Sequence, residues 1–240
     1  MNYRKLAWSQ AGFLLLALFG TAALAAGAGT VTHLSGTLSV QRADGSVRIL
    51  SQKSEVNPGD VLTTQRDSYA QINFTDGSSM TMRPNTQLKV EQYNFVQDRP
   101  QEDNSFLRLI KGGLRTVTGL VGKRGNQDAY KIGTNTATIG IRGSSGDTID
   151  STSNCEGVAT GCEKLEPAVS HQTYTGSYIM QNESGTQLIG EGQYGVSKDL
   201  KSPIEVRTGE IPGVGLRDMP FVLGVGGTGT LGPGGECAVR

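Results

Sequence analysis

Short runs of alternating hydrophobic and polar residues, separated by turn sequences, are the main pattern along this chain. In the first run, which begins at Val31, one face carries Leu34, Gly36, Leu38 and Val40. Such period-two alternation is typical of a half-buried β-strand. Asp44-Gly45 follows, a favoured hairpin turn because both positions tolerate positive φ. We therefore predict a hairpin, with one strand before the turn at 42–46 and a return strand containing Val47 and Ile49.

The segment from Tyr69 to Met82 shows the same pattern most clearly. Ala70, Ile72 and Phe74 alternate with polar residues, and the dipeptide 76–77 supplies an Asp-Gly turn. The methionines at 80 and 82 continue the apolar positions on the second strand. The alternation places Phe74 in the core and the neighbouring Thr75 in solvent. We predict that this hairpin is central to the fold.

Strand and turn signals continue at short intervals. Pro-Gly-Asp at 58–60 and Pro-Asn at 84–85 are turn sequences, and the polar segment 93–105 is expected to be a surface loop. Paired glycines at 112–113 interrupt an otherwise strand-like run, which predicts a bulged strand with a bend or a close backbone approach. Strand character resumes at 130–141.

Two distant segments also resemble each other in spacing. Residues 36–49 and 176–189 share a glycine, two large apolar residues, a second glycine and an isoleucine at the same offsets. This echo indicates two similar hairpins, although ordinary hairpin sequences produce such recurrences by chance. The whole pattern predicts an all-β fold in which successive short hairpins form a β-roll or sandwich-like domain.

The N-terminus has the features of a cleavable signal peptide covering residues 1–25. Arg4 and Lys5 are followed by an apolar stretch from Ala11 and by the small-x-small site at 23–25, which predicts cleavage before Ala26. The alternative is an uncleaved anchor helix. After cleavage we expect no integral membrane span, and a periplasmic or secreted location. A β domain at 26–208 and a flexible Gly-rich tail at 209–240 complete the predicted layout.

Composition narrows the possible functions. Glycine accounts for 34 of 240 residues, about twice its usual share of roughly 7%, which indicates many turns. The 22 basic and 22 acidic residues are interspersed, whereas nucleic-acid binding needs clustered Lys and Arg to displace counterions from phosphates. We therefore expect no nucleic-acid partner.

Three cysteines are present. Cys155 and Cys162 are close enough in sequence to close a small loop, which predicts a disulfide in an oxidising compartment. Zinc is the alternative, but the two histidines are remote in sequence from this pair. Cys237 is left over, either free or paired between chains.

The search for catalytic chemistry points to a protein that is not an enzyme and has no cofactor or metal. His33 and His171 are the only imidazoles and are expected in solvated or edge-strand positions, and no Gly-x-Ser-x-Gly motif is present. Asp60, Asp76 and Asp147 each lie beside glycine, where such a side chain commonly shapes a turn. The Gly-rich tail lacks the Lys-Ser/Thr ending of a phosphate loop.

Several motifs in order resemble the FecR domain family. They are Gly-Asp-x-Leu-x-Thr from residue 59, Ala-x-Ile-x-Phe-x-Asp-Gly-Ser from 70, Met-x-Pro-Asn-Thr-x-Leu-x-Val from 82, Lys-Gly-Gly-Leu-Arg from 111 and Thr-Ala-Thr-Ile-Gly-Ile-Arg-Gly from 136. The similarity covers about residues 29–143, with a looser continuation at 170–200. It implies an extracytoplasmic β-rich domain and, in the founding iron-citrate regulators, a role between an outer-membrane receptor and a sigma factor.

This sequence departs from the plan of those regulators. They carry a sigma-binding segment and a transmembrane helix ahead of the domain, whereas only residues 1–10 precede the apolar stretch here. We expect a non-catalytic periplasmic binding or scaffolding module whose partner is an envelope protein or a cell-wall polysaccharide. The alternative is an extracytoplasmic sensor component of a sigma-factor/receptor signalling system.

Arginines in the family-like segments are the candidate contacts for a polar ligand. Arg83, Arg115 and Arg142 each offer a fixed fork of donors that could hold a carboxylate or a sugar hydroxyl. The alternative is that each binds loop carbonyls within its own fold.

Overall fold

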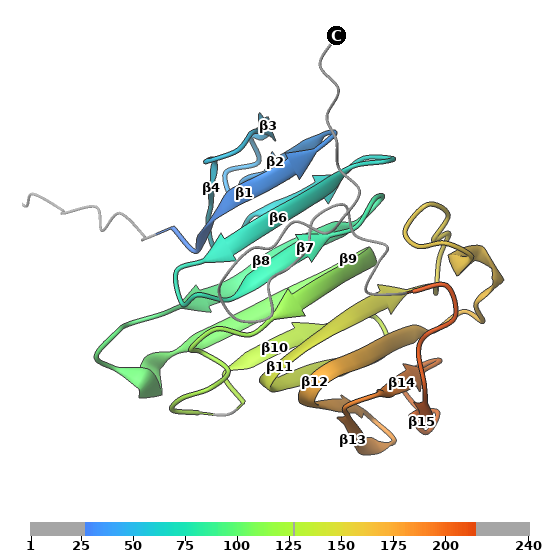
Figure 1. Cartoon of the computed structure of the whole chain (residues 1–240). Coiled ribbons are helices and arrows are strands. Elements are labelled where there is room, and N and C mark those ends of the chain that lie inside the picture. Colours follow the sequence, from blue (N-terminus) through green and yellow to red (C-terminus); the bar gives the residue numbers. More distant parts are fainter. Residues whose placement is uncertain (1–26, 127, 215–240) are drawn as a thin grey trace, which may run out of the picture.

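The computed structural model describes residues 27–126 and 128–214, and these form one extensive β-sheet (Figure 1). The predicted signal peptide, Cys237 and most of the Gly-rich tail lie outside the described residues. The first eight strands are β1 (Gly29–Ser35), β2 (Leu38–Gln41), β3 (Val47–Leu50), β4 (Glu55–Val56), β5 (Val61–Thr64), β6 (Tyr69–Phe74), β7 (Ser79–Met82) and β8 (Gln87–Asn94). The remaining strands are β9 (Asn104–Val117), β10 (Tyr130–Gly133), β11 (Thr138–Asp150), β12 (Val169–Asn182), β13 (Gly185–Gly190), β14 (Gln193–Ser197) and β15 (Glu205–Thr208).

The predicted all-β class is confirmed. Apart from the strands, the described residues contain two short 3₁₀ helices, at Pro100–Glu102 and Cys162–Lys164. Within this same part of the chain, no helix has the length and apolar character needed to cross a membrane.

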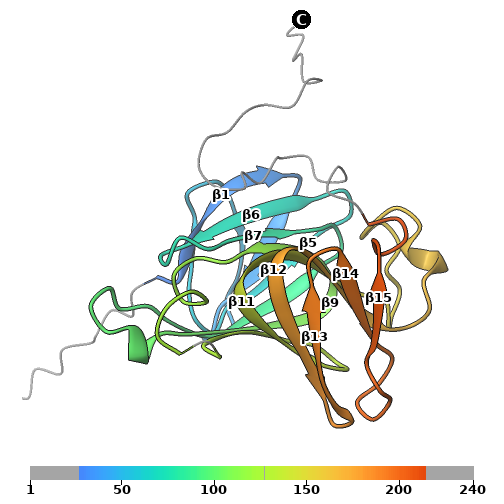
Figure 2. The same ribbon diagram turned by 60° about the horizontal axis from the view of Figure 1, so that its bottom comes forward.

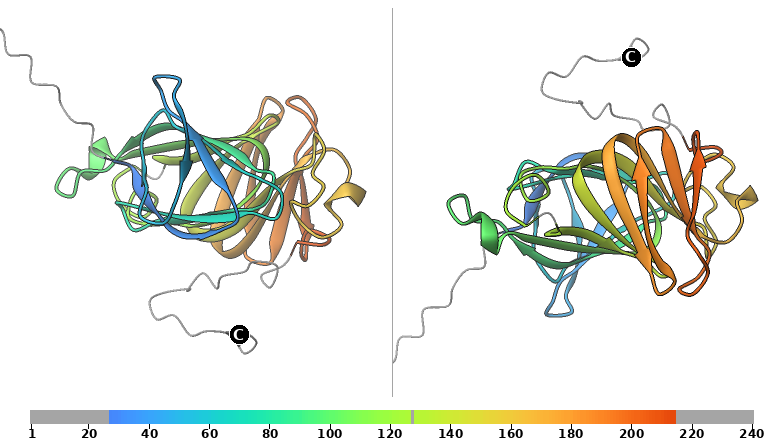
Figure 3. Two further views of the ribbon diagram at one scale, coloured as in Figure 1. Left: turned by 90° about the horizontal axis from the view of Figure 1, so that it is seen from above. Right: turned by 90° about the horizontal axis from the view of Figure 1, so that it is seen from below.

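Two series of strands meet at the long strand β9. One series runs β4-β1-β6-β7 and the other runs β3-β2-β5-β8, and both end on β9. The first half of β9 pairs with β8 and β10, while its second half pairs with β7 and β11. The N-terminal strands therefore curl around an enclosed core (Figures 2 and 3).

The change of partners in β9 occurs at its paired glycines, where the sequence predicted a bend or a close backbone approach. Gly112 has a φ of +92°, and a Cβ there would lie 2.5 Å from the hydroxyl oxygen of Thr86. That hydroxyl accepts a bond from the Gly113 N–H at 2.9 Å and donates one to the Gly113 carbonyl at 3.0 Å. Only glycine permits both the backbone conformation and this close approach.

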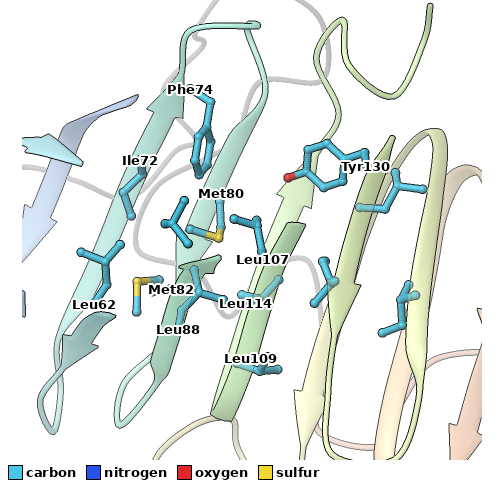
Figure 4. Close-up of a cluster of buried hydrophobic side chains, with 14 of the residues drawn as sticks. Leu62, Ile72, Phe74, Met80, Met82, Leu88, Leu107, Leu109, Leu114 and Tyr130 are labelled. Carbon is cyan, nitrogen blue, oxygen red and sulfur yellow. The ribbon is translucent and has the colours of Figure 1, made fainter. Parts of the chain in front are cut away.

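The main core lies between the two series of strands and is formed by aliphatic, methionine and aromatic side chains (Figure 4). Its largest members include Leu62, Ile72, Met80, Met82, Leu88, Leu107, Leu109, Leu114 and Tyr130, all with no exposed area. Phe74 joins them, so the predicted hairpin of β6 and β7 and the inward direction of Phe74 are confirmed.

The first predicted hairpin is only partly correct. Its turn joins β2 to β3, as expected. The preceding strand is not continuous, however, because Gly36 adopts a φ of +82° and separates β1 from β2. As a result β1 pairs with β4 and β6, whereas β2 pairs with β3 and β5.

A second, smaller hydrophobic cluster lies on the opposite face of β11 from the main core. It combines Ile149, the loop containing the disulfide, and the segment 209–214. Ile211 and Val214 are buried there, and the Ile211 N–H donates to Gln172 at 2.8 Å. The beginning of the segment predicted as a flexible tail therefore packs onto the domain, and the rest of that prediction falls outside the described residues.

Candidate functional site

The outer face of the sheet, opposite the main core, is hollowed into a groove of about 770 Å³ that crosses β8 to β12. One row of residues, in register from strand to strand, forms its floor: Gln92, Phe106, Lys131, Gly140 and Ile179. These strands follow one another in the sheet, so the sheet itself fixes the spacing of the row. Loops before β9 and β10 form one wall.

Side-chain amides line much of this groove. They belong to Gln92, Gln101, Asn104, Asn126 and Gln181. The Asn104 amide donates to the Gln92 side-chain oxygen at 2.8 Å, which orients the two groups relative to each other. Because each amide offers both donors and an acceptor, the groove can match neutral hydroxyl and amide groups of a ligand.

Phe106 supplies an apolar surface on the groove floor. A Cβ at Gly133 would lie 3.0 Å from its ring, so this glycine leaves the space that the ring occupies. The Arg108 guanidinium lies 5.3 Å from the ring centre and binds Glu91 through two hydrogen bonds, of 2.8 and 3.2 Å. These bonds hold the pKa of Glu91 below its ordinary value. The Phe106 ring is therefore packed against Gly133 and the Arg108 guanidinium.

Arg124 holds the wall of the groove together. Its guanidinium binds the Asp103 carboxylate at 2.9 Å and the carbonyls of Val96 and Gln97 at 2.9 and 2.6 Å. It also lies 4.7 Å from the centre of the Phe95 ring. A single side chain thus connects the segment before β9 to the segment before β10.

The three candidate arginines do not form one surface site. Arg83 and Arg115 both bind the carboxylate of Asp147. The sequence had predicted a turn role for Asp147 and not an ion pair. Arg83 donates to Asp147 at 2.8 Å, and Arg115 makes two bonds of 2.7 Å. Arg142 lies apart and exposed on β11, paired with Ser177.

This charge cluster is buried. Arg83 and Asp147 have no exposed side-chain area, and Arg115 has 5%. The Tyr174 hydroxyl also donates to Asp147, at 2.9 Å. Burial would raise the pKa of Asp147, but the bonds from Arg115 and the charge of Arg83 outweigh it and hold the pKa below its usual range. The carboxylate therefore stays ionised between two guanidinium groups.

Asp147 is thus a correction to the expectation of a turn residue, because it lies within β11 rather than in a loop. Asp60 and Asp76 do shape turns. Asp60 accepts the Asn57 N–H at 2.7 Å, and Asp76 accepts the Ser78 N–H at 3.0 Å. A neighbouring glycine does not show whether an aspartate lies in a turn or within a strand. Glycine also occurs in strands where another chain segment approaches closely.

His171 is a second correction. It was expected to be solvated or at a strand edge, yet it is fully buried with its ring 4.0 Å from that of Tyr178. One ring nitrogen bonds the Thr148 hydroxyl at 2.9 Å. Burial lowers its pKa to about 3, despite the opposing effect of the Asp147 charge, so the imidazole is neutral at physiological pH. His33 is exposed on β1, as predicted.

The predicted pairing of Cys155 with Cys162 is confirmed by a disulfide between them. Disulfides are typical of oxidising compartments outside the cytosol. Among residues 27–126 and 128–214, no group of three or more His, Cys, Asp or Glu side chains could hold a metal ion.

Comparisons with known proteins give a limited set of matches. A search of curated proteins found none. Two crystal structures of a putative anti-sigma factor from Parabacteroides distasonis ATCC 8503 align at 10% sequence identity, with TM-scores of 0.45 and 0.46. Each covers 62% of this chain and 60% of that chain, so this chain matches less than two thirds of that protein's length. A cell surface anchoring domain aligns at 24% identity over 25% of this chain and 80% of that chain, with a TM-score of 0.25.

The family comparison is more specific. Residues 60–159 match the family described as FecR protein. This match begins later than the resemblance at 29–143 and extends into the disulfide loop. It contains Arg83, Arg115 and Asp147, together with β6, β7 and the bend of β9. The chain therefore carries a FecR domain over residues 60–159.

Proposed function

We propose that this protein is a non-catalytic binding module of the periplasm and that its groove holds an envelope polysaccharide. The observation that carries the proposal is that five side-chain amides and one aromatic ring line the same groove. Sugars present hydroxyl groups around an apolar ring face. Amides match the hydroxyls, while Phe106 and the half-buried Ile179 offer surfaces for the apolar face.

The dimensions of the groove favour a polymer. It crosses five neighbouring strands, and the four gaps between them, each about 4.8 Å, give a floor of about 20 Å. This length accommodates several sugar units of a chain. The groove carries charges of both signs, with Lys131 on the floor and Asp128 at the wall. It therefore does not favour a highly charged ligand.

The proposed location rests on two further observations. The N-terminal sequence has the order of a signal peptide, with basic, apolar and small-residue regions. The Cys155–Cys162 disulfide is the kind of bond that persists in the periplasm or outside the cell. N-terminal sequencing of the fractionated protein tests this part, with Ala26 as the expected first residue.

The binding proposal is tested by co-sedimentation of the exported protein with purified peptidoglycan sacculi. Gln92→Ala combined with Gln181→Ala removes two amides from the groove and is expected to weaken binding about tenfold. Gln41→Ala combined with Gln52→Ala is the matched control, because these two glutamines are exposed elsewhere and should leave binding unchanged. Equal binding by both double variants would contradict the role of the groove.

A second variant blocks the groove without removing any of its groups. At Gly140 the nearest atom to an added Cβ is the Ile179 carbonyl oxygen at 3.8 Å, an ordinary contact, so a Cβ fits there without disturbing the sheet. Gly140→Leu should therefore abolish sedimentation while the protein remains folded. If wild-type protein does not sediment at all, but deletion changes transcription of envelope genes, the sensor role replaces this proposal.

A further inference from the structure

A row of polar residues crosses the outer face of the sheet and is separate from the groove. Its members stand in register from β6 to β12: Gln71, Thr81, Arg115, Asp147 and Gln172. The neighbours of Gln71 and Thr81 along their strands, including Ile72 and Met80, belong to the main core. Because successive side chains of a strand point to opposite faces, the row points outward. None of its members lines the groove.

This outward row is buried, although the outer face of an antiparallel sheet commonly meets solvent. The exposed fractions of its five members run from 0% for Thr81 to 8% for Gln71. The other series of strands carries a comparable outward row in which every residue is half-buried or exposed: Ile49, Ser39, Thr63, Gln87 and Lys111. The difference between the two rows calls for a segment that covers the face of β6 to β12.

The chain itself covers one end of the row. Gln172 accepts a bond from the Ile211 N–H at 2.8 Å and donates one to the Gly209 carbonyl at 3.0 Å. Three residues after Ile211, Val214 packs in the smaller hydrophobic cluster with Ile149 of β11. The segment 209–214 therefore passes from β12 to β11, in the direction of β9, β7 and β6.

Thr81 marks a place where a partner is needed. Its side chain has no exposed area, yet its hydroxyl bonds no residue in the described part of the chain. Buried hydroxyl groups normally have a hydrogen-bond partner. A backbone that lies across the row would bring carbonyl and N–H groups to Thr81, as the segment 209–211 does at Gln172.

The residues that follow Val214 have the length and the composition for this role. The steps from β11 to β9, β7 and β6 add up to about 15 Å, which about five extended residues span. Leu216, Met219 and the run Phe221-Val222-Leu223 come within this reach or just beyond it, and mostly glycine follows from residue 224. The stretch 215–223 therefore holds most of the apolar side chains that can bury surface in this part of the sequence.

We propose that residues 215–223 lie across β9, β7 and β6 and cover Arg115, Thr81 and Gln71. The backbone of this stretch bonds the polar row, and its apolar side chains exclude water from the row. The C-terminal segment is thus a built-in cover for one face of the sheet, which it closes to other proteins. The groove, whose lining lies elsewhere on the sheet, stays open.

Cysteine labelling of the full mature chain under native conditions tests this cover. Thr81→Cys is combined with Cys237→Ser, so that the new thiol is the only one outside the Cys155–Cys162 disulfide. A buried thiol reacts only when its cover opens, so its reaction with a disulfide reagent should be about tenfold slower than that of Ile49→Cys in the same background. Ile49 is the matched control, because it lies on the exposed row and is 69% exposed. Equally fast labelling at the two positions would overturn the proposal.

Two further variants identify the covering segment. A chain that ends at Val214 should label about tenfold faster at Thr81→Cys and at an unchanged rate at Ile49→Cys, because only the first position loses its cover. In the full chain, Phe221→Glu should also speed labelling at Thr81→Cys, whereas Leu231→Glu, placed in the glycine-rich remainder, should not. Protection that persists in both the shortened chain and Phe221→Glu would refute the assignment to residues 215–223. Protection that disappears on dilution would assign the cover to a second copy of the chain and refute it as well.

Discussion

Arg83 and Asp147 are 64 residues apart in sequence, yet they form an ion pair of 2.8 Å with no exposed side-chain area. Arg83 follows β7, and Asp147 lies within β11. The two strands do not pair with each other, because β9 lies between them and contributes Arg115. The Arg83–Asp147 and Arg115–Asp147 ion pairs together therefore connect β7, β9 and β11 on the face that the disulfide loop covers.

Replacing the shared carboxylate should be strongly destabilising. Asp147→Asn removes the negative charge that the Arg83 and Arg115 guanidinium groups share, and breaking a buried ion pair in this way costs about 3 to 5 kcal/mol. Urea unfolding measures the loss. Glu205→Gln, which removes an exposed partner of Arg207, is the control and should unfold at the wild-type midpoint. A loss equally small for both variants would show that the buried pair does not stabilise the fold.

The bend of β9 should depend on the absence of a side chain at Gly112. Gly112→Ala combines a positive φ with a Cβ placed 2.5 Å from Thr86, and such backbone strain alone costs about 1 to 3 kcal/mol. Gly140→Ala is the matched strand control, because its added Cβ meets only ordinary contacts. Thermal unfolding should rank Gly112→Ala well below Gly140→Ala, and the reverse order would refute the role given to the bend.

The hairpin of β6 and β7 offers a direct comparison of two neighbouring residues. Phe74 is 4% exposed and its ring lies 5.3 Å from that of Tyr93, so Phe74→Ala should cost about 3 to 5 kcal/mol. Thr75 is exposed, and its side-chain hydroxyl bonds the Tyr93 hydroxyl, which keeps its contacts with Asp76. Thr75→Ala should therefore stay within about 0.5 kcal/mol of wild type. Similar urea midpoints for the two variants would contradict this register.

Stability should fall on mild acidification because of His171. Its pKa is about 3 in the folded protein and about 6.5 in an unfolded chain. Between these values the unfolded chain binds more protons, so the free energy of unfolding decreases as pH falls through this window. The loss from pH 7 to pH 5 should be about 2 kcal/mol.

The variant His171→Gln removes this titration and should show a smaller loss between pH 7 and pH 5, whatever its stability at pH 7. Urea unfolding at several pH values measures both curves. Asp147 adds its own acid sensitivity at lower pH, because its folded pKa is below its ordinary value, so the comparison is made above pH 5. Parallel curves for the two proteins would exclude His171 as the source.

The two segments with matching spacing show how far a local pattern can predict structure. Gly36 and Gly176 both adopt positive φ, and the two large apolar residues that follow each of them are buried. The hairpin registers differ by one residue, because Leu38 pairs with Leu50 whereas Tyr178 pairs with Ile189. Ile49 is consequently 69% exposed while Ile189 is buried. A slip of one residue moves a side chain to the other face, and spacing alone does not record it.

The sequence by itself determined the all-β class, the hairpin of β6 and β7, the bend at Gly112-Gly113, the disulfide and the resemblance to the FecR family. Each of these depends on residues close together in the chain, where alternation, turn chemistry and the special conformations of glycine act directly. Only the tertiary structure decided that Asp147 would form ion pairs with Arg83 and Arg115 and that His171 would be buried. It also decided that residues from five strands would line one groove. These features depend on strand pairing between distant segments. That pairing, and not the neighbours in sequence, decides which face of a strand another segment buries.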